Sequence, residues 1–270
     1  MMDKLDHLSK SQVGCWLRCN MQWYYRYIEG IKSPPSGNMT LGLSYHKAHE
    51  DNFSQKIETK EDLKDDDVKE IFSEDFEERH KDEVVYGAGE SKGTFKDNGV
   101  KMVSTYHLNV SPSIKPLAVE RKFDIQFDNM DWSLTGFIDL EEEHGITDHK
   151  TTGKRPSVLN LGDKQTVMTG GLIDEFNLEA SIYLLADKYA FGNDDRQFGW
   201  DYSISTKTPY IVRATYNNKP QYEKRVLDTL GKVAGQINAC IKSGDFIENT
   251  EHPWACNKKF CGYWQKCQGE

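Results

Sequence analysis

Long apolar runs are missing from these 270 residues, which excludes a membrane-spanning helix of about 20 apolar residues. Linkers rich in proline, glycine or serine are missing as well, and so are internal repeats, so we expect one domain over residues 1–270. The first six residues, MMDKLD, lack the apolar core of a secretory signal. We therefore expect a cytoplasmic globular protein that has no membrane partner.

Positive charge is also in short supply, because 34 lysines and arginines face 43 aspartates and glutamates, for a net charge of −9. An even spread of this charge would disfavour binding to a polyanion. The excess, however, lies in residues 50–83, which hold 15 acidic and 6 basic side chains. We interpret this segment as a solvated helical face or a loose lid. Contacts with a polyanion would then come from basic groups elsewhere, such as Arg121, Lys122, Lys154 and Arg155.

A Gly-x4-Gly-Lys-Ser/Thr loop, which binds nucleotide phosphates in ATP-driven enzymes, is missing too. Any step that needs ATP would therefore depend on a partner. Cysteine is scarce, with six in the chain. In a reducing compartment these cysteines are expected as metal ligands or buried thiols sooner than as disulfides.

Apolar residues make up 37% of the chain, which is enough for a core. Their periodicity predicts helices over 9–28, 41–57, 93–108, 173–190 and 219–243, with further helix in the acidic segment up to about residue 80. Strands are predicted over 117–127, 131–141, 145–151, 197–206 and 209–216, and residues 153–172 read as an irregular loop. This order predicts an α/β fold with a mixed central β-sheet flanked by helices. We divide the chain into a helical N-terminal part (1–110) with an acidic insertion (50–83), an α/β core (111–245) and a cysteine-bearing tail (246–270).

The most informative segment is a predicted hairpin formed by residues 136–140 and 146–151. Asp139 and Asp148 each follow an apolar run, and the hairpin carries both to the same end of the sheet. Side chains alternate along a strand, so Asp148 and Lys150 share a face. Two carboxylates and an ammonium group are costly to bring together unless a divalent metal binds there, and the lysine can then position or deprotonate a water. The alternative is a pair of aspartates that cap turns.

Further motifs accompany the hairpin along the chain. They are Leu8-Ser9, residues 19–27 (CNMQWYYRY), residues 42–46 (GLSYH), Val119-Glu120, residues 179–183 (EASIY) and three cysteines near the end. This ordered set resembles the PD-(D/E)XK nuclease superfamily, in particular the RecB-type nucleases with an iron–sulfur centre. These include the AddB-type helicase–nucleases and the CRISPR-adaptation and phage exonucleases. The resemblance covers nearly the whole chain and implies a restriction-endonuclease-like core.

The resemblance assigns roles to the residues of the hairpin. It implies that Asp139 and Asp148 hold Mg²⁺ or Mn²⁺, with the backbone carbonyl of His149 as a further ligand. It also implies that Lys150 acts on the attacking water and that Glu120 lies near the metal or that water. The alternative for Glu120 is a surface glutamate paired with a neighbouring cation.

His46 is the remaining candidate ligand. It stands four residues before Glu50, so the two share one face of the predicted helix. In RecB-type nucleases the histidine of this motif is a metal ligand, and an imidazole ligand favours Mn²⁺ over Mg²⁺. The alternative is a packed or capping histidine. His49 lies off this face, and we expect a structural role for it.

Four residues are predicted to contact DNA, namely Glu179, Tyr183, Lys154 and Arg155. The family has glutamine where this chain has Glu179, and an ionised glutamate only accepts hydrogen bonds. A carboxylate there would repel phosphate unless it is bound to metal. Tyr183 can bond a phosphate or stack on a base. The alternative is that both residues belong to an amphipathic core helix.

The tail carries Cys256, Cys261 and Cys267 within 12 residues. By resemblance, they join Cys19 from the other end of the chain around a [4Fe-4S] cluster. The gap between the first two is longer than the family's usual spacing. A four-cysteine Zn²⁺ site and free thiols are the alternatives. Cys15, one turn before Cys19, is an alternative fourth ligand.

The combined pattern predicts a metal-dependent deoxyribonuclease, with exonuclease activity favoured, that acts in DNA recombination, repair or CRISPR adaptation. The expected partners are DNA, single-stranded or with a free end, and a helicase or a recombination or CRISPR protein. One alternative is a DNA-binding accessory subunit with a structural iron–sulfur or zinc site and weak or no nuclease activity, which the intact Asp139, Asp148 and Lys150 argue against. Another is a non-nucleolytic four-cysteine metal module, which the hairpin and His46 argue against.

Overall fold

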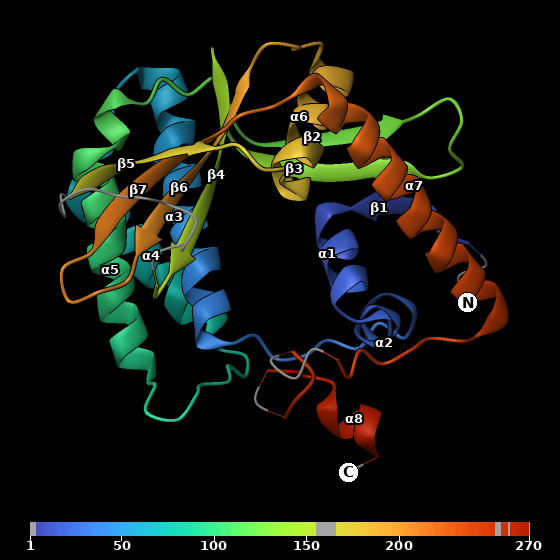
Figure 1. The fold of residues 1–270 in the computed structure, drawn as a ribbon. Helices are drawn as coiled ribbons and strands as arrows, with labels where there is room; N and C mark the ends of the chain where they lie inside the picture. Colours follow the sequence, from blue (N-terminus) through green and yellow to red (C-terminus); the bar gives the residue numbers. More distant parts are fainter. Residues whose placement is uncertain (1–3, 155–165, 252–254, 259, 270) are drawn as a thin grey trace.

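A mixed β-sheet forms the centre of the molecule in the computed structural model, which describes residues 4–154, 166–251, 255–258 and 260–269. Within these residues the sheet has seven strands in the order β1-β3-β4-β6-β7-β5, with β2 beside β3. Helices lie on both of its sides (Figure 1). The predicted α/β class is therefore confirmed. Arg155 lies outside the described residues.

The strands are β1 (His7–Ser9), β2 (Ala118–Gln126), β3 (Ser133–Glu142), β4 (Gly145–Thr152), β5 (Val167–Ile173), β6 (Gln197–Ile204) and β7 (Tyr210–Tyr216). The α-helices are α1 (Lys10–Arg18), α2 (Asn20–Trp23), α3 (Gly37–Thr59), α4 (Asp65–Arg79), α5 (Lys92–Asn109), α6 (Leu178–Phe191), α7 (Pro220–Ser243) and α8 (Trp264–Gln268). A π-helical turn over Tyr24–Ile28 continues α2, and a 3₁₀ turn over Ser111–Ser113 follows α5.

Strands β2, β3 and β4 form an antiparallel meander, and β4 then pairs in parallel with β6. In the β3–β4 pair, Leu140 lies opposite Thr147. The same register continued by one residue places Asp139 beside Asp148. The predicted hairpin thus carries both aspartates to one end of the sheet.

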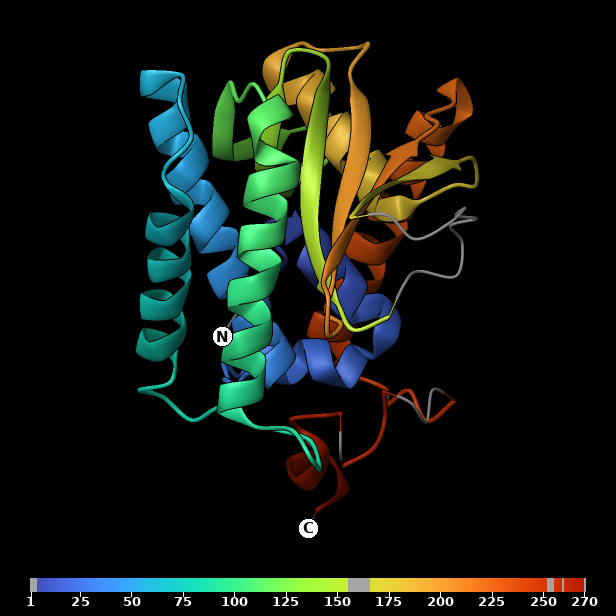
Figure 2. The same ribbon diagram turned by 90° about the vertical axis from the view of Figure 1, so that its left-hand side faces the viewer.

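Two layers of helices bury the apolar faces of the sheet. Helices α3, α4 and α5 pack against one another on one side, and α6 packs with α7 on the other (Figures 1 and 2). The acidic segment is part of the first layer, because α4 buries Val68, Phe72 and Phe76 and turns its carboxylates outward. It is a packed helix with a charged face and not a loose lid. None of the described helices combines the length and the apolarity needed to cross a membrane.

The helix predicted over residues 9–28 begins as expected, with Ser9 as its N-cap, but breaks at Cys19. Cys19 has extended backbone angles (φ −166°, ψ 119°) and ends α1 before α2 begins. In a continuous helix, Cys15 and Cys19 would share a face. The break separates them, because Cys15 stays in the apolar core while Cys19 lines a pocket against the tail.

A strand, β5, replaces the last part of the loop predicted over 153–172, and α6 begins at residue 178 instead of 173. The loop prediction rests on the Gly, Thr and Asp content of residues 153–172. In the structure, Gly171 has a positive φ of 78° at a β-bulge, and a Cβ on Gly170 would lie 2.9 Å from Val212 Cγ1. Glycine here permits a bulged strand close to β7.

The glycines of α5 give a direct test of the packing between α4 and α5. A Cβ on Gly99 would lie 2.0 Å from Cζ of the fully buried Phe72, whereas a Cβ on Gly93 would meet nothing within 4 Å. We expect Gly99→Ala to lower the free energy of unfolding by about 1–3 kcal/mol through overpacking. Gly93→Ala in the same helix should leave it unchanged or raise it by up to about 1 kcal/mol. Urea unfolding measures both, and equal effects would show that α4 does not pack on α5 as described.

Candidate active site

Three potential metal ligands from three elements meet at one end of the β2–β3–β4 meander. His46 comes from α3, Glu120 from β2 and Asp139 from β3, and their ligand atoms all lie within 4.8 Å of one another. His46 Nδ1 is 3.3 Å from Asp139 Oδ2. Two carboxylates and an imidazole at this spacing form a donor set that suits a divalent ion such as Mn²⁺ or Mg²⁺.

Strand β4 closes the same site with backbone groups. The His149 N–H donates a hydrogen bond to Asp139 Oδ2 at 2.9 Å, which fixes that carboxylate. The His149 carbonyl lies 2.9 Å from His46 Nε2, at the edge of the ligand group. The structure therefore brings together four of the expected residues, His46, Glu120, Asp139 and His149.

Glu120 is held in an unfavourable state. Its φ of 44° is left-handed, which is uncommon for a residue with a side chain and is typical of functional sites. Burial, together with the nearby charges of Asp139 and Glu50, raises the pKa of Glu120 to about 7. This carboxyl group is therefore not the surface glutamate paired with a cation that the sequence left as the alternative.

Asp148 lies next to this ligand group and not within it. Its Oδ2 is 2.6 Å from Lys150 Nζ, which confirms that the two side chains share a face of β4. Burial and the charge of Asp139 raise the pKa of Asp148. Burial acts to lower the pKa of Lys150, but Asp148 and Glu179 outweigh it and raise that pKa. Lys150 is therefore a cation that donates hydrogen bonds in this arrangement.

Glu179 is neutralised by two lysines. Its Oε1 accepts a hydrogen bond from Lys150 Nζ at 2.9 Å and also pairs with Lys10, and Trp200 Nε1 donates to its other oxygen. Burial raises the pKa of Glu179, but the lysines dominate and lower it. The carboxylate therefore adds no uncompensated negative charge to the site. Nothing in the sequence indicated that Lys10 belongs to the site, because its position directly after the N-cap Ser9 was its only notable feature.

Tyr183 and Lys154, two of the predicted DNA contacts, lie in surroundings that differ from each other. The Tyr183 ring stacks on Phe198 at 5.5 Å and meets Phe123 edge-on, so it is largely a core residue, although it also lines a groove that reaches Asp139. Lys154 is exposed at the end of β4. Arg121 donates through Nη1 to both oxygens of Glu141, so its charge is partly paired.

A buried polar chain behind His149 was missed by the sequence analysis. Tyr106 Oη donates to Asp201 Oδ2 at 2.8 Å, and Arg213 Nε donates to Asp201 Oδ1 at 2.8 Å. Since the phenol hydrogen goes to Asp201, the His149 Nε2–H is the donor in its 3.0 Å contact with Tyr106 Oη. The chain fixes the His149 ring and hence the strand that carries Asp148 and Lys150. His49 packs against Tyr106 and His149, which agrees with the structural role expected for it.

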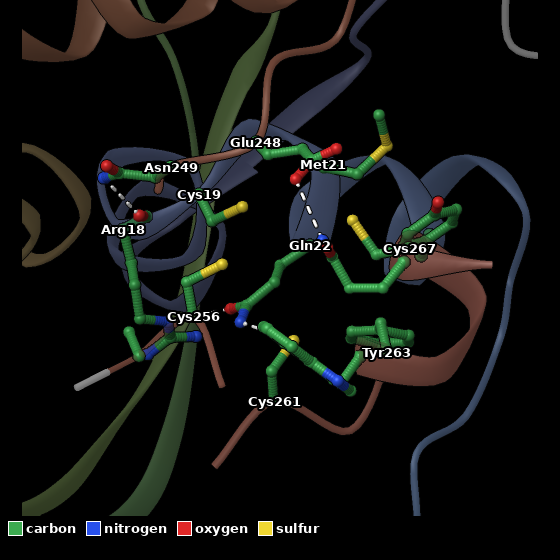
Figure 3. Close-up of a pocket in the computed structure, with 14 residues that line it drawn as sticks. Arg18, Cys19, Met21, Gln22, Glu248, Asn249, Cys256, Cys261, Tyr263 and Cys267 are labelled. Atoms are coloured by element: carbon green, nitrogen blue, oxygen red, sulfur yellow. Dashed lines mark hydrogen bonds between the residues drawn. The ribbon is translucent and has the colours of Figure 1, made fainter. Parts of the chain in front are cut away.

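The four tail-associated cysteines line one pocket between α2 and α8. Cys19, Cys256, Cys261 and Cys267 stand on its walls, and Gln22 Nε2 donates to Cys261 Sγ at 3.2 Å (Figure 3). The tail is anchored there by hydrogen bonds and by close packing. Tyr263 Oη donates to the Ile31 carbonyl, Lys266 pairs with Glu29, and Gly262 packs so tightly on Ser33 that a Cβ would overlap it.

The family model of the PD-(D/E)XK nuclease superfamily matches residues 7–268. A crystal structure of a "Putative exonuclease" from Eubacterium rectale has a similar fold, with a TM-score of 0.57 and 12% sequence identity over 91% of this chain and 85% of that chain. At this identity the likeness shows the fold alone. A search of curated proteins finds no match.

The raised pKa of Glu120 predicts a measurable dependence of stability on pH. The fold favours the protonated carboxyl group, so this contribution is complete below pH 4.5 and is lost as the pH rises through about 7. In metal-free protein, Glu120→Gln should therefore raise the free energy of unfolding at pH 8 by about 1–2 kcal/mol and change it little at pH 4.5. Glu143, an exposed residue in the turn between β3 and β4, offers a control. Glu143→Gln should leave the free energy of unfolding unchanged at either pH. Parallel pH profiles for Glu120→Gln and the wild type would contradict this account.

Proposed function

Because the chain belongs to the PD-(D/E)XK nuclease superfamily, we propose that it is a deoxyribonuclease that hydrolyses phosphodiester bonds with Mg²⁺ or Mn²⁺. The observation that carries the proposal is the convergence of His46, Glu120 and Asp139 beside the Asp148–Lys150 pair. The residues fit a divalent ion, since they offer two carboxylate groups and an imidazole within 4.8 Å, next to the His149 carbonyl. Asp148 would complete this set.

The metal, when bound, would stabilise negative charge on the scissile phosphate and lower the pKa of a water molecule. The protein's own groups would do the rest. Lys150 would donate hydrogen bonds to the attacking water or to a phosphate oxygen, and Asp148 would orient that lysine. Glu120 would bind the metal as a carboxylate, together with His46 and Asp139. Lys10 and Glu179 would hold Lys150 from its other side.

We further propose that the enzyme acts on DNA ends, as an exonuclease. The name of the E. rectale protein, which shares the fold, agrees with this activity. Tyr183, Glu179, Lys154 and Arg155 remain our candidates for DNA contacts. Glu179 would act in this way through Lys10 and Lys150, which neutralise it, and not as a direct phosphate ligand.

For the tail we propose a [4Fe-4S] cluster held by Cys19, Cys256, Cys261 and Cys267. Four thiols line one pocket, and the Gln22 amide donates to one of them, as hydrogen-bond donors around metal–sulfur sites do. A single tetrahedral Zn²⁺ with bonds of about 2.3 Å would hold the sulfurs about 3.8 Å apart. Among the described residues, no three cysteine sulfurs lie within 4.8 Å of one another. The sulfurs as placed therefore do not form a compact tetrahedral zinc site, and a cluster would tie the two ends of the chain together.

The nuclease assignment predicts the effect of removing Lys150. Lys150→Met should reduce cleavage of labelled DNA in Mn²⁺ or Mg²⁺ at least about 100-fold, because it removes the donor beside the reacting phosphate. DNA binding should persist, since phosphate contacts come from other groups. The control is Lys188→Met, which breaks a similar ion pair with Glu223 on the surface formed by α6 and α7.

Lys188→Met should retain the cleavage rate of the wild type, and urea unfolding should show that both variants are folded. Normal turnover by folded Lys150→Met would sink the hydrolytic role of this lysine. A wild-type protein that binds DNA and never cuts it in either metal would support the accessory-subunit alternative.

The cysteine site predicts a coloured protein. Purified without oxygen, the wild type should be brown and hold about four iron atoms per chain. Cys19→Ser should be bleached and less stable. Cys15→Ser should keep the iron, because Cys15 lies in the apolar core, and so should Cys240→Ser. A colourless wild-type protein with one zinc ion per chain would refute the cluster, and bleaching by Cys15→Ser alone would refute the choice of Cys19.

A further inference from the structure

A large aromatic side chain is exposed to solvent beside the proposed metal ligands. Phe137 lies on β3 two residues before Asp139 and is 51% exposed. Single exposed apolar residues are common and need no explanation by themselves. Phe137 differs in its position, because it lines the same groove as Asp139 and takes no part in either apolar core cluster of the described residues.

Strand geometry fixes how this ring relates to the site. Thr135, Phe137 and Asp139 occupy alternate positions of β3 and share one of its faces, whereas Leu134 and Ile138 point the other way and are buried. Two residues along a strand span about 7 Å. Stacked nucleotides rise about 3.4 Å each along one strand of DNA, so the ring would stand within one or two nucleotides of a phosphate held by a metal ion at Asp139.

The groove around Phe137 also offers cations and hydroxyl groups. Lys122 lies directly opposite Phe137 in the β2–β3 pair and is exposed. Ser11, at the start of α1, lines another wall of the same groove together with Lys10, which is paired with Glu179, and Asp6 and Asp124 line the groove as well. Lysines that track a backbone beside an aromatic ring form the usual combination in sites for single-stranded nucleic acid.

We propose that Phe137 is a base-stacking subsite for an unpaired nucleotide of the substrate strand, with Lys122 on the adjacent phosphate. The proposal rests on the proposed nuclease function and adds the strand state of the substrate. A duplex hides its base faces in the stack, and exposing one costs unstacking energy. A single strand or a frayed end offers a free base face to the ring. The subsite therefore selects unpaired DNA next to the cleavage position.

Equilibrium binding in the presence of a chelator tests this proposal without cleavage. The probe is a fluorescent single-stranded DNA of about 12 nucleotides, with a set of copies that each carry one abasic position. Phe137→Ala should weaken binding of the intact strand roughly 5- to 100-fold, the range expected for loss of one base–aromatic stack. Phe137→Leu should behave in the same way, because it keeps apolar area but lacks a ring, and Phe137→Trp should restore binding. The control is Leu108→Ala. Leu108 lies on α5 and is similarly exposed, and its replacement should leave DNA binding unchanged.

The abasic set identifies the interaction. At one position, removal of the base should weaken binding by the wild type and have no further effect on Phe137→Ala. The proposal is overturned if Phe137→Ala binds the intact strand like the wild type, or if it loses the same factor on every abasic strand. If the wild type cleaves DNA and Phe137→Ala binds the strand normally, the stacking subsite is refuted and the nuclease function stands. If the wild type loses binding at one abasic position but cleaves no DNA, the nuclease function is refuted and the stacking subsite stands.

Discussion

Repulsion between carboxylates governs the arrangement where the β2–β3–β4 meander meets α3 and α6. Four carboxylates converge there, from Glu120, Asp139, Asp148 and Glu179. Lys10 and Lys150 neutralise one half of this group by ion pairs. In the other half, where His46 lies against Asp139, burial and the charge of Asp139 raise the pKa of Glu120. A divalent cation would supply the missing charge, and under the proposed function the site accepts some cost in stability in order to bind that ion.

The rigidity of β4 makes this concentration of charge possible. Its side chains alternate, so Asp148 and Lys150 face the carboxylates while His149 points into the apolar layer of α3 and α5. There the chain of Tyr106, Asp201 and Arg213 holds the imidazole in one orientation. The His149 backbone in turn donates to Asp139 and presents its carbonyl to His46. One residue thus connects the ligand group to the buried interior, and precise ligand placement depends on contacts made on the far side of the strand.

The sequence was sufficient where local patterns decide the structure. Alternation and turn residues located the hairpin, so the proximity of Asp139, Asp148 and Lys150 was predictable, and so was the α/β class. Contacts between segments that are distant in the sequence were not predictable. The pairing of Lys10 with Glu179 joins residues 169 positions apart. Strand β5 was not predictable because residues 153–172 are rich in Gly, Thr and Asp, which favour a loop locally, whereas parallel pairing with the distant β7 decides its conformation. The break at Cys19 was not predictable from local pattern either, because it places Cys19 in a pocket that is lined by the distant tail.

The central claim is that this charge arrangement exists to bind one divalent ion, and calorimetric titration of the metal-free protein with Mn²⁺ tests it most directly. The account predicts one Mn²⁺ per chain at the meander, with affinity that falls at least about tenfold in His46→Ala and in Asp139→Asn. Affinity should also fall below about pH 7, where Glu120 takes up a proton that competes with the metal. The opposite result would be Mn²⁺ binding of equal strength and stoichiometry in both variants and in the wild type, which would place the ion elsewhere and contradict the account.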